Sequence, residues 1–364
     1  ARAGRRVAML DRAGRIKPCG GAIPPRLIDD FHIPESQIVA KIGTARMISP
    51  TQRSVDIPIE NGFVGMVDRE HFDEFLRVRA HGAGADRFTG TFLRIERDED
   101  GPAIVYRDKA SREERRLETT LIIGADGARS DVARAEVPGG DTIPYVIAYH
   151  EIIKAPEATE RYNPLRCDVI YDGAISPDFY GWVFPHGSSA SVGMGTGIDG
   201  VDLKKATAAL RVASGLEHCE TIRKEGAPIP LKPLDKWDNG KDVVLAGDAA
   251  GVVAPSSGEG IYYAIKSSKL AAESILRNST EEKNNQLANY YKKQVAKAFL
   301  GNLKQSLKFS YRLHDHLDLF FKAMKYLPEA THVFSELADG KSYKWANNYF
   351  MLRTFKILGR AMLA

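Results

Sequence analysis

The fold is decided by residues 242–275, DVVLAGDAAGVVAPSSGEGIYYAIKSSKLAAESI. A short apolar run ends at Gly247-Asp248, and a long segment with helical periodicity follows the small residues of 255–260. This order is typical of a buried strand that passes through a tight turn into a helix, where glycines let the backbone approach another group closely. The free N–H groups at such a helix start stabilise negative charge. We predict a ligand-facing strand–turn–helix unit here, with a purely structural turn as the alternative.

Residues 117–134, LETTLIIGADGARSDVAR, repeat this pattern around Gly124-Ala125-Asp126-Gly127. A third piece stands at the start of the chain, where VAML at 7–10 predicts a buried parallel strand closed by Asp11. In a Rossmann-type unit the second strand ends in an acid that bonds a ribose hydroxyl, and the G-x-G-x-x-G turn lies roughly 20 residues earlier. Because the chain holds no such turn at that place, we expect a first strand, a phosphate loop and most of a helix to precede residue 1.

Length and composition set broad bounds on the protein. The 364 residues exceed what one core usually supports, so we expect two intertwined domains or one domain with an appendage. A net charge of +4 does not argue for nucleic acid, and no apolar run is long enough to span a membrane. The cysteines (Cys19, Cys167, Cys219) lack C-x-x-C spacing, and the histidines, including His314 and His316, lack metal-ligand spacing. We predict no metal site and a reducing, cytoplasmic setting.

Two further stretches make the pattern specific: KPCGG at 17–21 and YGWVFP at 180–185. Together with the turns above, they resemble the geranylgeranyl reductases, a branch of the p-hydroxybenzoate-hydroxylase-like flavoproteins with a Y-x-W-x-F-P signature. The stretch KPCGGAIPPRLIDDF and the long C-terminal extension look most like the (bacterio)chlorophyll-biosynthetic members of that family, and the archaeal lipid reductases are more distant. The resemblance covers about residues 1–300.

The resemblance implies an α/β fold in which a Rossmann-type FAD domain is interleaved with an antiparallel-sheet substrate domain. The first strand and the G-x-G-x-x-G turn of the FAD domain are missing from this chain, and helices follow at the C-terminus. Alternating patterns such as IPYVIAYHEI and RCDVIYD support the antiparallel sheet. The expected segments are 1–38, 62–142 and 240–300 for the FAD-binding domain, 39–61 and 143–239 for the substrate domain, and 301–364 for the helical extension.

The same resemblance implies the cofactor contacts. The helix start after 255–260 is expected to face the N1–C2=O edge of the flavin, where reduced flavin carries negative charge. Arg69 follows a plausible N-cap, Asp68, and is expected to face the cofactor, with a solvated surface arginine as the alternative. The residues assigned to FAD are Asp11, Arg69, Gly124, Asp126, Gly127, Gly247, Asp248, Pro255, Gly258 and Gly260.

Substrate contacts are expected from Tyr180, Trp182 and Phe184, which alternate along one strand and so share a face. Such a stripe is also typical of an ordinary core, but the resemblance, with Pro185, implies a wall against a long polyprenyl chain that offers only apolar area. Cys19 is the candidate catalytic residue, as a proton donor or a shaping contact. The alternative is a small buried thiol.

The resemblance implies an NADPH-dependent flavoprotein reductase. Three double bonds of a geranylgeranyl group would be saturated to phytyl, on geranylgeranyl diphosphate or on geranylgeranyl-(bacterio)chlorophyll. Two alternatives stay open: a flavin monooxygenase of the same fold, and a non-enzymatic prenyl-lipid carrier. No separate dinucleotide domain shows where NADPH docks.

The segment from Gly301 is basic, amphipathic and rich in aromatic residues. This pattern favours peripheral contact with the photosynthetic membrane or a pigment-synthesis protein partner. A helical cap on the FAD domain is the alternative.

Overall fold

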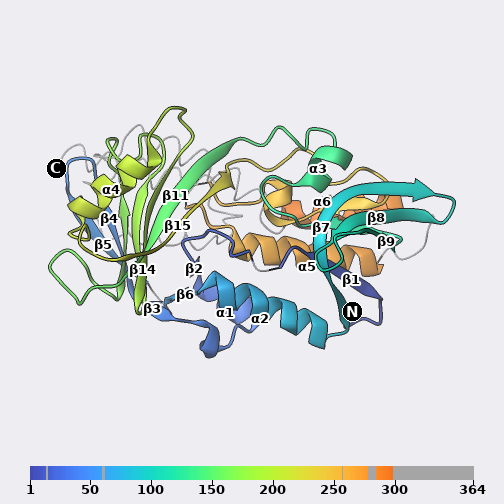
Figure 1. The fold of residues 1–364 in the computed structure, drawn as a ribbon, viewed down its shortest axis with the longest axis horizontal. Coiled ribbons are helices and arrows are strands. Elements are labelled where there is room, and N and C mark those ends of the chain that lie inside the picture. The colour runs from blue at the N-terminus through green and yellow to red at the C-terminus, as the bar shows by residue number, and fades with distance from the viewer. Residues whose placement is uncertain (14, 60–61, 256, 278–283, 298–364) are drawn as a thin grey trace.

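The computed structural model describes residues 1–297 apart from 14, 60–61, 256 and 278–283 (Figure 1). The predicted extension at 301–364, with His314 and His316, lies outside the described residues. A large sheet forms one end of the molecule, and smaller sheets with long helices form the other (Figure 1). None of the helices within the described ranges is long and apolar enough to cross a membrane.

The large sheet has seven strands, and its order mixes distant parts of the chain. All neighbouring strands pair antiparallel except β12 and β4, which pair parallel from Arg166↔Thr44 to Ile170↔Ile48. The predicted antiparallel sheet therefore includes one parallel junction. The two strands come from distant segments, so no hairpin dictates their direction. The order is β15 (Thr221–Pro230), β11 (Tyr145–Lys154), β14 (Ser189–Thr196), β13 (Gly181–His186), β12 (Arg166–Ile170), β4 (Thr44–Ile48) and β5 (Ser54–Pro58).

One face of this sheet is covered by α4 (Leu203–Ala213). Leu210 of this helix packs with Val192 and Met194, and all three are fully buried. The opposite face therefore carries the remaining side chains of the sheet toward the rest of the molecule, because neighbouring residues along a strand point to opposite faces.

Two parallel pairings organise the other end of the molecule. Strand β1 (Val7–Asp11) pairs with β7 (Ala85–Asp98), which continues through β8 (Gly101–Asp108) to β9 (Glu114–Glu118). Strand β10 (Ile122–Gly124) pairs parallel with β16 (Val243–Leu245). The two glycine turns predicted from sequence therefore leave the same edge of one sheet, because parallel strands end on the same side.

The prediction that residues 7–10 are buried is wrong in part. Val7 is 37% exposed, and Met9 and Leu10 are only half-buried. Within the part of the chain that the structure describes, β1 pairs with β7 alone and β10 with β16 alone, so each strand has one edge without a strand partner. An edge strand with one open side cannot bury its side chains as a central strand does.

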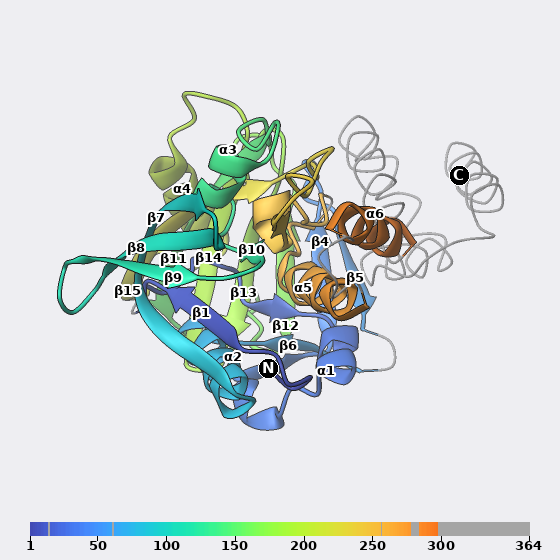
Figure 2. The ribbon, with the colours of Figure 1, turned by 90° about the vertical axis from the view of Figure 1, so that its right-hand side faces the viewer.

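The remaining elements complete the half of the molecule outside the large sheet (Figure 1). Asp68 caps α2 as predicted, because its side chain accepts a hydrogen bond from Glu70 N. Figure 2 shows α5 beside α6, and Tyr291 of α6 donates a hydrogen bond to the Leu245 carbonyl. These elements are β2 (Ala22–Ile23), α1 (Pro25–Phe31), η1 (Glu35–Gln37), β3 (Ala40–Ile42), β6 (Val64–Met66), α2 (Arg69–Gly82), α3 (Asp131–Glu136), η2 (Gly247–Ala250), α5 (Ile261–Arg277) and α6 (Asn284–Val295).

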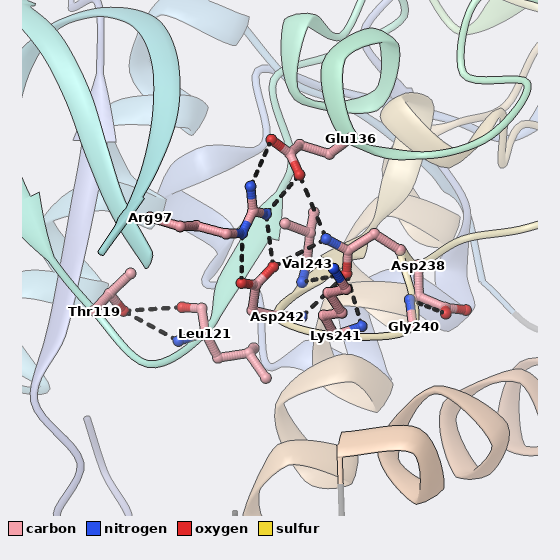
Figure 3. Close-up of polar contacts among 10 residues, drawn as sticks. Arg97, Thr119, Leu121, Glu136, Asp238, Gly240, Lys241, Asp242 and Val243 are labelled. Carbon is pink, nitrogen blue, oxygen red and sulfur yellow. Dashed lines mark hydrogen bonds and ion pairs between the residues drawn. The ribbon is translucent and has the colours of Figure 1, made fainter. Parts of the chain in front are cut away.

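An ion-pair network joins the end of β7 to α3 and to the start of β16 (Figure 3). Arg97 donates to both carboxylate oxygens of Asp242 at 2.8 Å and to Glu136 Oε2 at 2.6 Å. The hydrogen bond from Arg97 lowers the pKa of Asp242 even though burial opposes this. The network ties the four-stranded sheet to the two-stranded sheet that carries the glycine turns.

Candidate functional site

Asp248 lies in η2, directly after β16, and its carboxylate is mostly buried. Its Oδ2 is 2.6 Å from Lys17 Nζ. The structure thus joins two predicted motifs, the Gly-Asp turn and the KPCGG loop, through an ion pair that the sequence analysis missed. The signal was present in the lysine at the head of KPCGG, but nothing local in the sequence names its partner.

The loop from Pro255 to Gly260 is built for close approach. Gly258 has φ +66°, and a Cβ there would lie 3.3 Å from the Phe179 ring and 3.4 Å from Tyr180 Oη. A Cβ at Gly260 would lie 3.3 Å from Asp248 Oδ1. Side chains at these positions would fill the space between the loop and its neighbours, so the small residues fit a cradle for a flat ligand such as a flavin.

Glu259 is a second feature that the sequence analysis missed. Its Oε1 accepts a hydrogen bond from Tyr262 N at 2.8 Å, so the side chain caps the start of α5. Burial raises the pKa of Glu259 to about 7, the Tyr262 N–H opposes this rise, and the charge of Asp248 adds to it. Its position between two glycines at a helix start signals a capping role, and it places a carboxyl that titrates near neutrality beside the loop.

Arg69 and Cys19 lie together. Arg69 Nε and Nη2 donate to the two carboxylate oxygens of Asp73 at 2.8 and 2.9 Å, and the Cys19 side chain lies near the guanidinium. Burial alone lowers the pKa of Arg69, but Cys19 and Asp73 outweigh it and the net shift is upward. The Arg69 side chain is only 12% exposed, so the alternative of a solvated surface arginine is wrong.

The loop that carries Cys19 is clamped onto the seven-stranded sheet. His186 Nε2 lies 2.9 Å from the Gly20 carbonyl, which accepts its hydrogen. Burial lowers the pKa of His186, which favours the neutral ring. Gly21 has φ +70°, and a Cβ there would come within 2.4 Å of the His186 ring. These contacts explain both glycines of KPCGG as packing requirements of the clamp.

We call Tyr180, Trp182 and Phe184 the aromatic wall. The ring centroids of neighbouring members are 6.1 and 6.2 Å apart, as expected for residues that alternate on one face. Pro185, also predicted to contact the substrate, falls at the alternate position of β13 and so lies on the opposite face; its substrate contact stays a prediction. The wall touches both loops: the Phe184 ring lies against Gly20, and Tyr180 Oη donates to the Ser257 carbonyl at 2.5 Å.

Asp11 and Asp126 have local partners. Asp11 accepts from Ala13 N at 2.6 Å and from Arg77 Nη2 at 3.1 Å. Asp126 accepts from the Ser130 hydroxyl and from Asp131 N at the start of α3. Each acid therefore has a structural reason to be present, and the cofactor role assigned to each stays a prediction.

The glycines near β10 and β16 differ in kind. A Cβ at Gly124 would come within 2.7 Å of Leu245 and 2.8 Å of Val132, so this position needs glycine for close packing. Gly127 has φ +93° with open space around it, and Gly247 has φ +61°. These two positions need glycine for backbone conformation, which fits a turn at the edge of a ligand site.

A groove of about 590 Å³ lies elsewhere, at the edge of β4 and β5. Arg46 and Arg166 line it, on the face of the sheet opposite the aromatic wall. Both arginines are already paired, with Asp56 and Asp168. The groove therefore offers no free cation from this pair, and none of the predicted site residues borders it.

Comparison with known proteins agrees with this geometry. Residues 33–143 match the model of an FAD binding domain. The chain is 69% identical to a geranylgeranyl diphosphate reductase of Rhodobacter capsulatus, over 76% of this chain and 70% of that protein. It is 40% identical to a chloroplastic geranylgeranyl diphosphate reductase of rice, over 77% of this chain and 63% of the rice protein.

A solved structure from Thermoplasma acidophilum, described as geranylgeranyl bacteriochlorophyll reductase-like, superimposes with a TM-score of 0.81. The match covers 98% of this chain and 94% of the other at 21% identity. At that identity the likeness concerns the fold, which is a mixed α/β fold with an FAD-binding domain.

Proposed function

The chain belongs to the geranylgeranyl diphosphate reductase family, and from that membership we propose that it saturates isolated double bonds of a geranylgeranyl group. FAD is the cofactor that its FAD-binding domain holds. The curated relatives carry a name that states this substrate as the diphosphate. The loop that carries Ser257, Gly258 and Gly260 is called the glycine loop below. The observation that supports the proposal most is the hydrogen bond from Tyr180 Oη of the aromatic wall to the Ser257 carbonyl of this loop.

The residues that would hold FAD are those of the glycine loop together with Asp248 and Lys17. When bound, the flavin supplies a hydride donor to the alkene. Gly258 and Gly260 would keep side chains away from the ring, and the positive end of the α5 dipole would favour its anionic form, with Glu259 holding the Tyr262 N–H. The Asp248–Lys17 pair closes the site at the KPCGG loop.

The aromatic wall would hold the alkene. An isolated double bond has no group that a charged residue can activate, so binding must supply position and exclusion of water. Tyr180 and Trp182 are less than 9% exposed, so the surface that they form is dry. Cys19 lies on the loop that packs against Phe184, and we propose it as the candidate that delivers a proton to the second alkene carbon or shapes the pocket there.

The finer details belong to the same proposal. NADPH would reduce the cofactor, three of the four double bonds would be saturated, and the product would serve (bacterio)chlorophyll synthesis. Peripheral contact with a photosynthetic membrane and a pigment-synthesis partner are proposed on the sequence of the extension alone. The substrate would be geranylgeranyl diphosphate or the geranylgeranyl pigment.

Anaerobic turnover of the flavin-loaded protein tests the proposal. Geranylgeranyl diphosphate and NADPH should give products whose mass rises in steps of two hydrogens. A Tyr149→Phe variant, which alters the opposite face of the sheet, serves as the matched control and should behave as the wild type. Oxygen-dependent NADPH consumption with an oxygenated product, and no alkene reduction without oxygen, would identify a monooxygenase instead.

A further inference from the structure

A row of polar groups crosses the seven-stranded sheet behind Trp182. The strand register places Glu225 of β15 opposite His150 of β11, His150 opposite Gly193 of β14, and Gly193 opposite Trp182 of β13. Residues in such a row share one face of the sheet. The charged and polar members therefore lie on the same face as the aromatic wall.

Ser191 links the row to the indole. Trp182 Nε1 donates to Ser191 Oγ at 3.0 Å, and His150 Nδ1 lies 2.9 Å from the same oxygen. An indole N–H can only donate, so Ser191 accepts there, and its own hydrogen is free to point to the imidazole. Ser191 is 0% exposed and His150 2%, so water does not replace either bond.

Glu225 completes the row at the outer side of His150. Its Oε2 lies 3.2 Å from His150 Nε2, and Arg223 pairs with its other carboxylate oxygen. Burial raises the pKa of Glu225, but His150 and Arg223 outweigh this and lower it, which keeps the group a carboxylate. This contact falls short of hydrogen-bond geometry, so Glu225 acts on His150 through its charge, while Nδ1 of the ring faces Ser191.

Gly193 provides the room for this arrangement. A Cβ there would come within 2.4 Å of His150 Cβ and 2.6 Å of the Trp182 ring. The imidazole and the indole therefore close over the glycine, with ring centroids 6.1 Å apart. Gly193 and the Ser191 hydroxyl therefore constrain the Trp182 indole directly, and the Glu225 carboxylate does so through His150.

We propose that His150, Ser191 and Glu225 are positioning residues that fix the Trp182 indole and so set which double bond of a prenyl chain is presented along the aromatic wall. The inference rests on the proposed function, because it assigns the wall to the prenyl chain. A long chain of repeated isoprene units has no polar group along its length to set its register. A fixed bulky ring is then the feature that stops the chain at a defined depth.

A double-mutant cycle tests this proposal with Ser191→Ala, Trp182→Phe and both together, and with Tyr149→Phe as control. Binding of geranylgeraniol to the oxidised, flavin-loaded protein is measured by equilibrium binding of the radiolabelled alcohol, and product distribution is measured in anaerobic turnover. Ser191→Ala should raise the Kd about tenfold and broaden the product distribution, because it leaves the indole N–H without a partner. In the Trp182→Phe background, which has no indole N–H, the same change should shift the Kd less than about twofold.

Additive effects of the two substitutions, or an equal shift in the Tyr149→Phe control, would overturn the inference. Should Ser191→Ala fail to fold, His150→Phe enters the same cycle, since it keeps a ring but removes the nitrogen that faces Ser191, and its effect must again vanish in the Trp182→Phe background. A non-additive cycle in binding, combined with no reduction of geranylgeranyl diphosphate by the wild type, would support the positioning role and refute the proposed reaction. The two failures are therefore distinguishable.

Discussion

Asp248 has neighbours of two kinds: the Lys17 ammonium at 2.6 Å and the small residues around Gly260. The ammonium compensates the mostly buried carboxylate, and the glycine leaves its other oxygen accessible from the loop side. An acid in this setting is suited to hold the hydroxyl groups of a ligand. The residue type at 248 therefore has a reason beyond the turn itself.

Replacing Asp248 by Ala should reduce FAD affinity about 10- to 100-fold, because a hydrogen bond to a charged group contributes roughly 1.5–3 kcal/mol. Flavin content after gel filtration and a titration of the stripped protein with FAD measure the loss. Asp56→Ala removes a half-exposed carboxylate of an ion pair remote from the wall and is the control. A folded Asp248→Ala protein that keeps its full flavin would show that the cofactor assignment is wrong.

Glu259 should make stability depend on pH in an unusual direction. Its pKa is about 7 in the folded protein against an ordinary value of 4.5, so between these values the folded state holds a proton that the unfolded state releases. The contribution to stability is fully present below about pH 4.5 and is lost as the pH rises through about 7. Urea unfolding of the wild type and of Glu259→Gln, at about pH 5 and about pH 8, measures it. The variant should lack this loss, and parallel curves for the two proteins would contradict the prediction.

At the scale of the elements, the guanidinium of Arg97 links the end of β7 to α3 and to the start of β16 (Figure 3). Both acids that it contacts are only 12–13% exposed, whereas the arginine itself is 35% exposed. Solvent screening at the arginine moderates the strength of the pairs, and the burial of the acids makes their loss costly. The sheet that carries the glycine turns is thereby fixed to its neighbour.

Arg97→Met should lower the free energy of unfolding by about 1–3 kcal/mol at neutral pH. The pKa of Asp242 is lowered in the folded state, so the contribution of the pair is present above about 3.8 and is lost as the pH falls through the folded value. The difference between wild type and variant in urea unfolding should therefore shrink in acid. Arg94→Met, at a half-exposed pair, is the control and should change the free energy of unfolding far less than Arg97→Met does.

Sequence patterns were sufficient where the cause is local. The parallel strands before both glycine turns, the Asp68 cap and the alternation of Tyr180 with Trp182 follow from periodicity and turn chemistry. The parallel β12–β4 junction and the Lys17–Asp248 pair depend on which distant segments meet, and local residue types do not encode this. The polar row behind Trp182 was missed for the same reason, since its members come from three separate strands.

On the scale of the whole molecule, hydrogen bonds between described residues connect the large sheet to the loops of the other half, and three of them share one form. Tyr180 Oη reaches the Ser257 carbonyl, His186 Nε2 reaches the Gly20 carbonyl at 2.9 Å, and Tyr145 Oη reaches the Ala128 carbonyl at 2.6 Å. All three run from side chains of the sheet to backbone of the loops. In the proposed function the loops hold the cofactor and the aromatic wall holds the substrate, so these bonds connect two separate binding tasks.

This separation predicts that two changes in one wall have opposite effects. Tyr180→Phe keeps the ring but removes the bond to Ser257, so FAD affinity should fall about 2- to 10-fold while the Kd for geranylgeraniol changes less than about twofold. Trp182→Ala empties the buried centre of the wall, so the Kd for geranylgeraniol should rise at least about tenfold while FAD affinity is retained. Titration of both variants with each ligand gives the four values. If either substitution weakened both ligands to a similar degree, the aromatic wall would be a common core of the two halves and not a substrate surface joined to a cofactor loop by one hydroxyl.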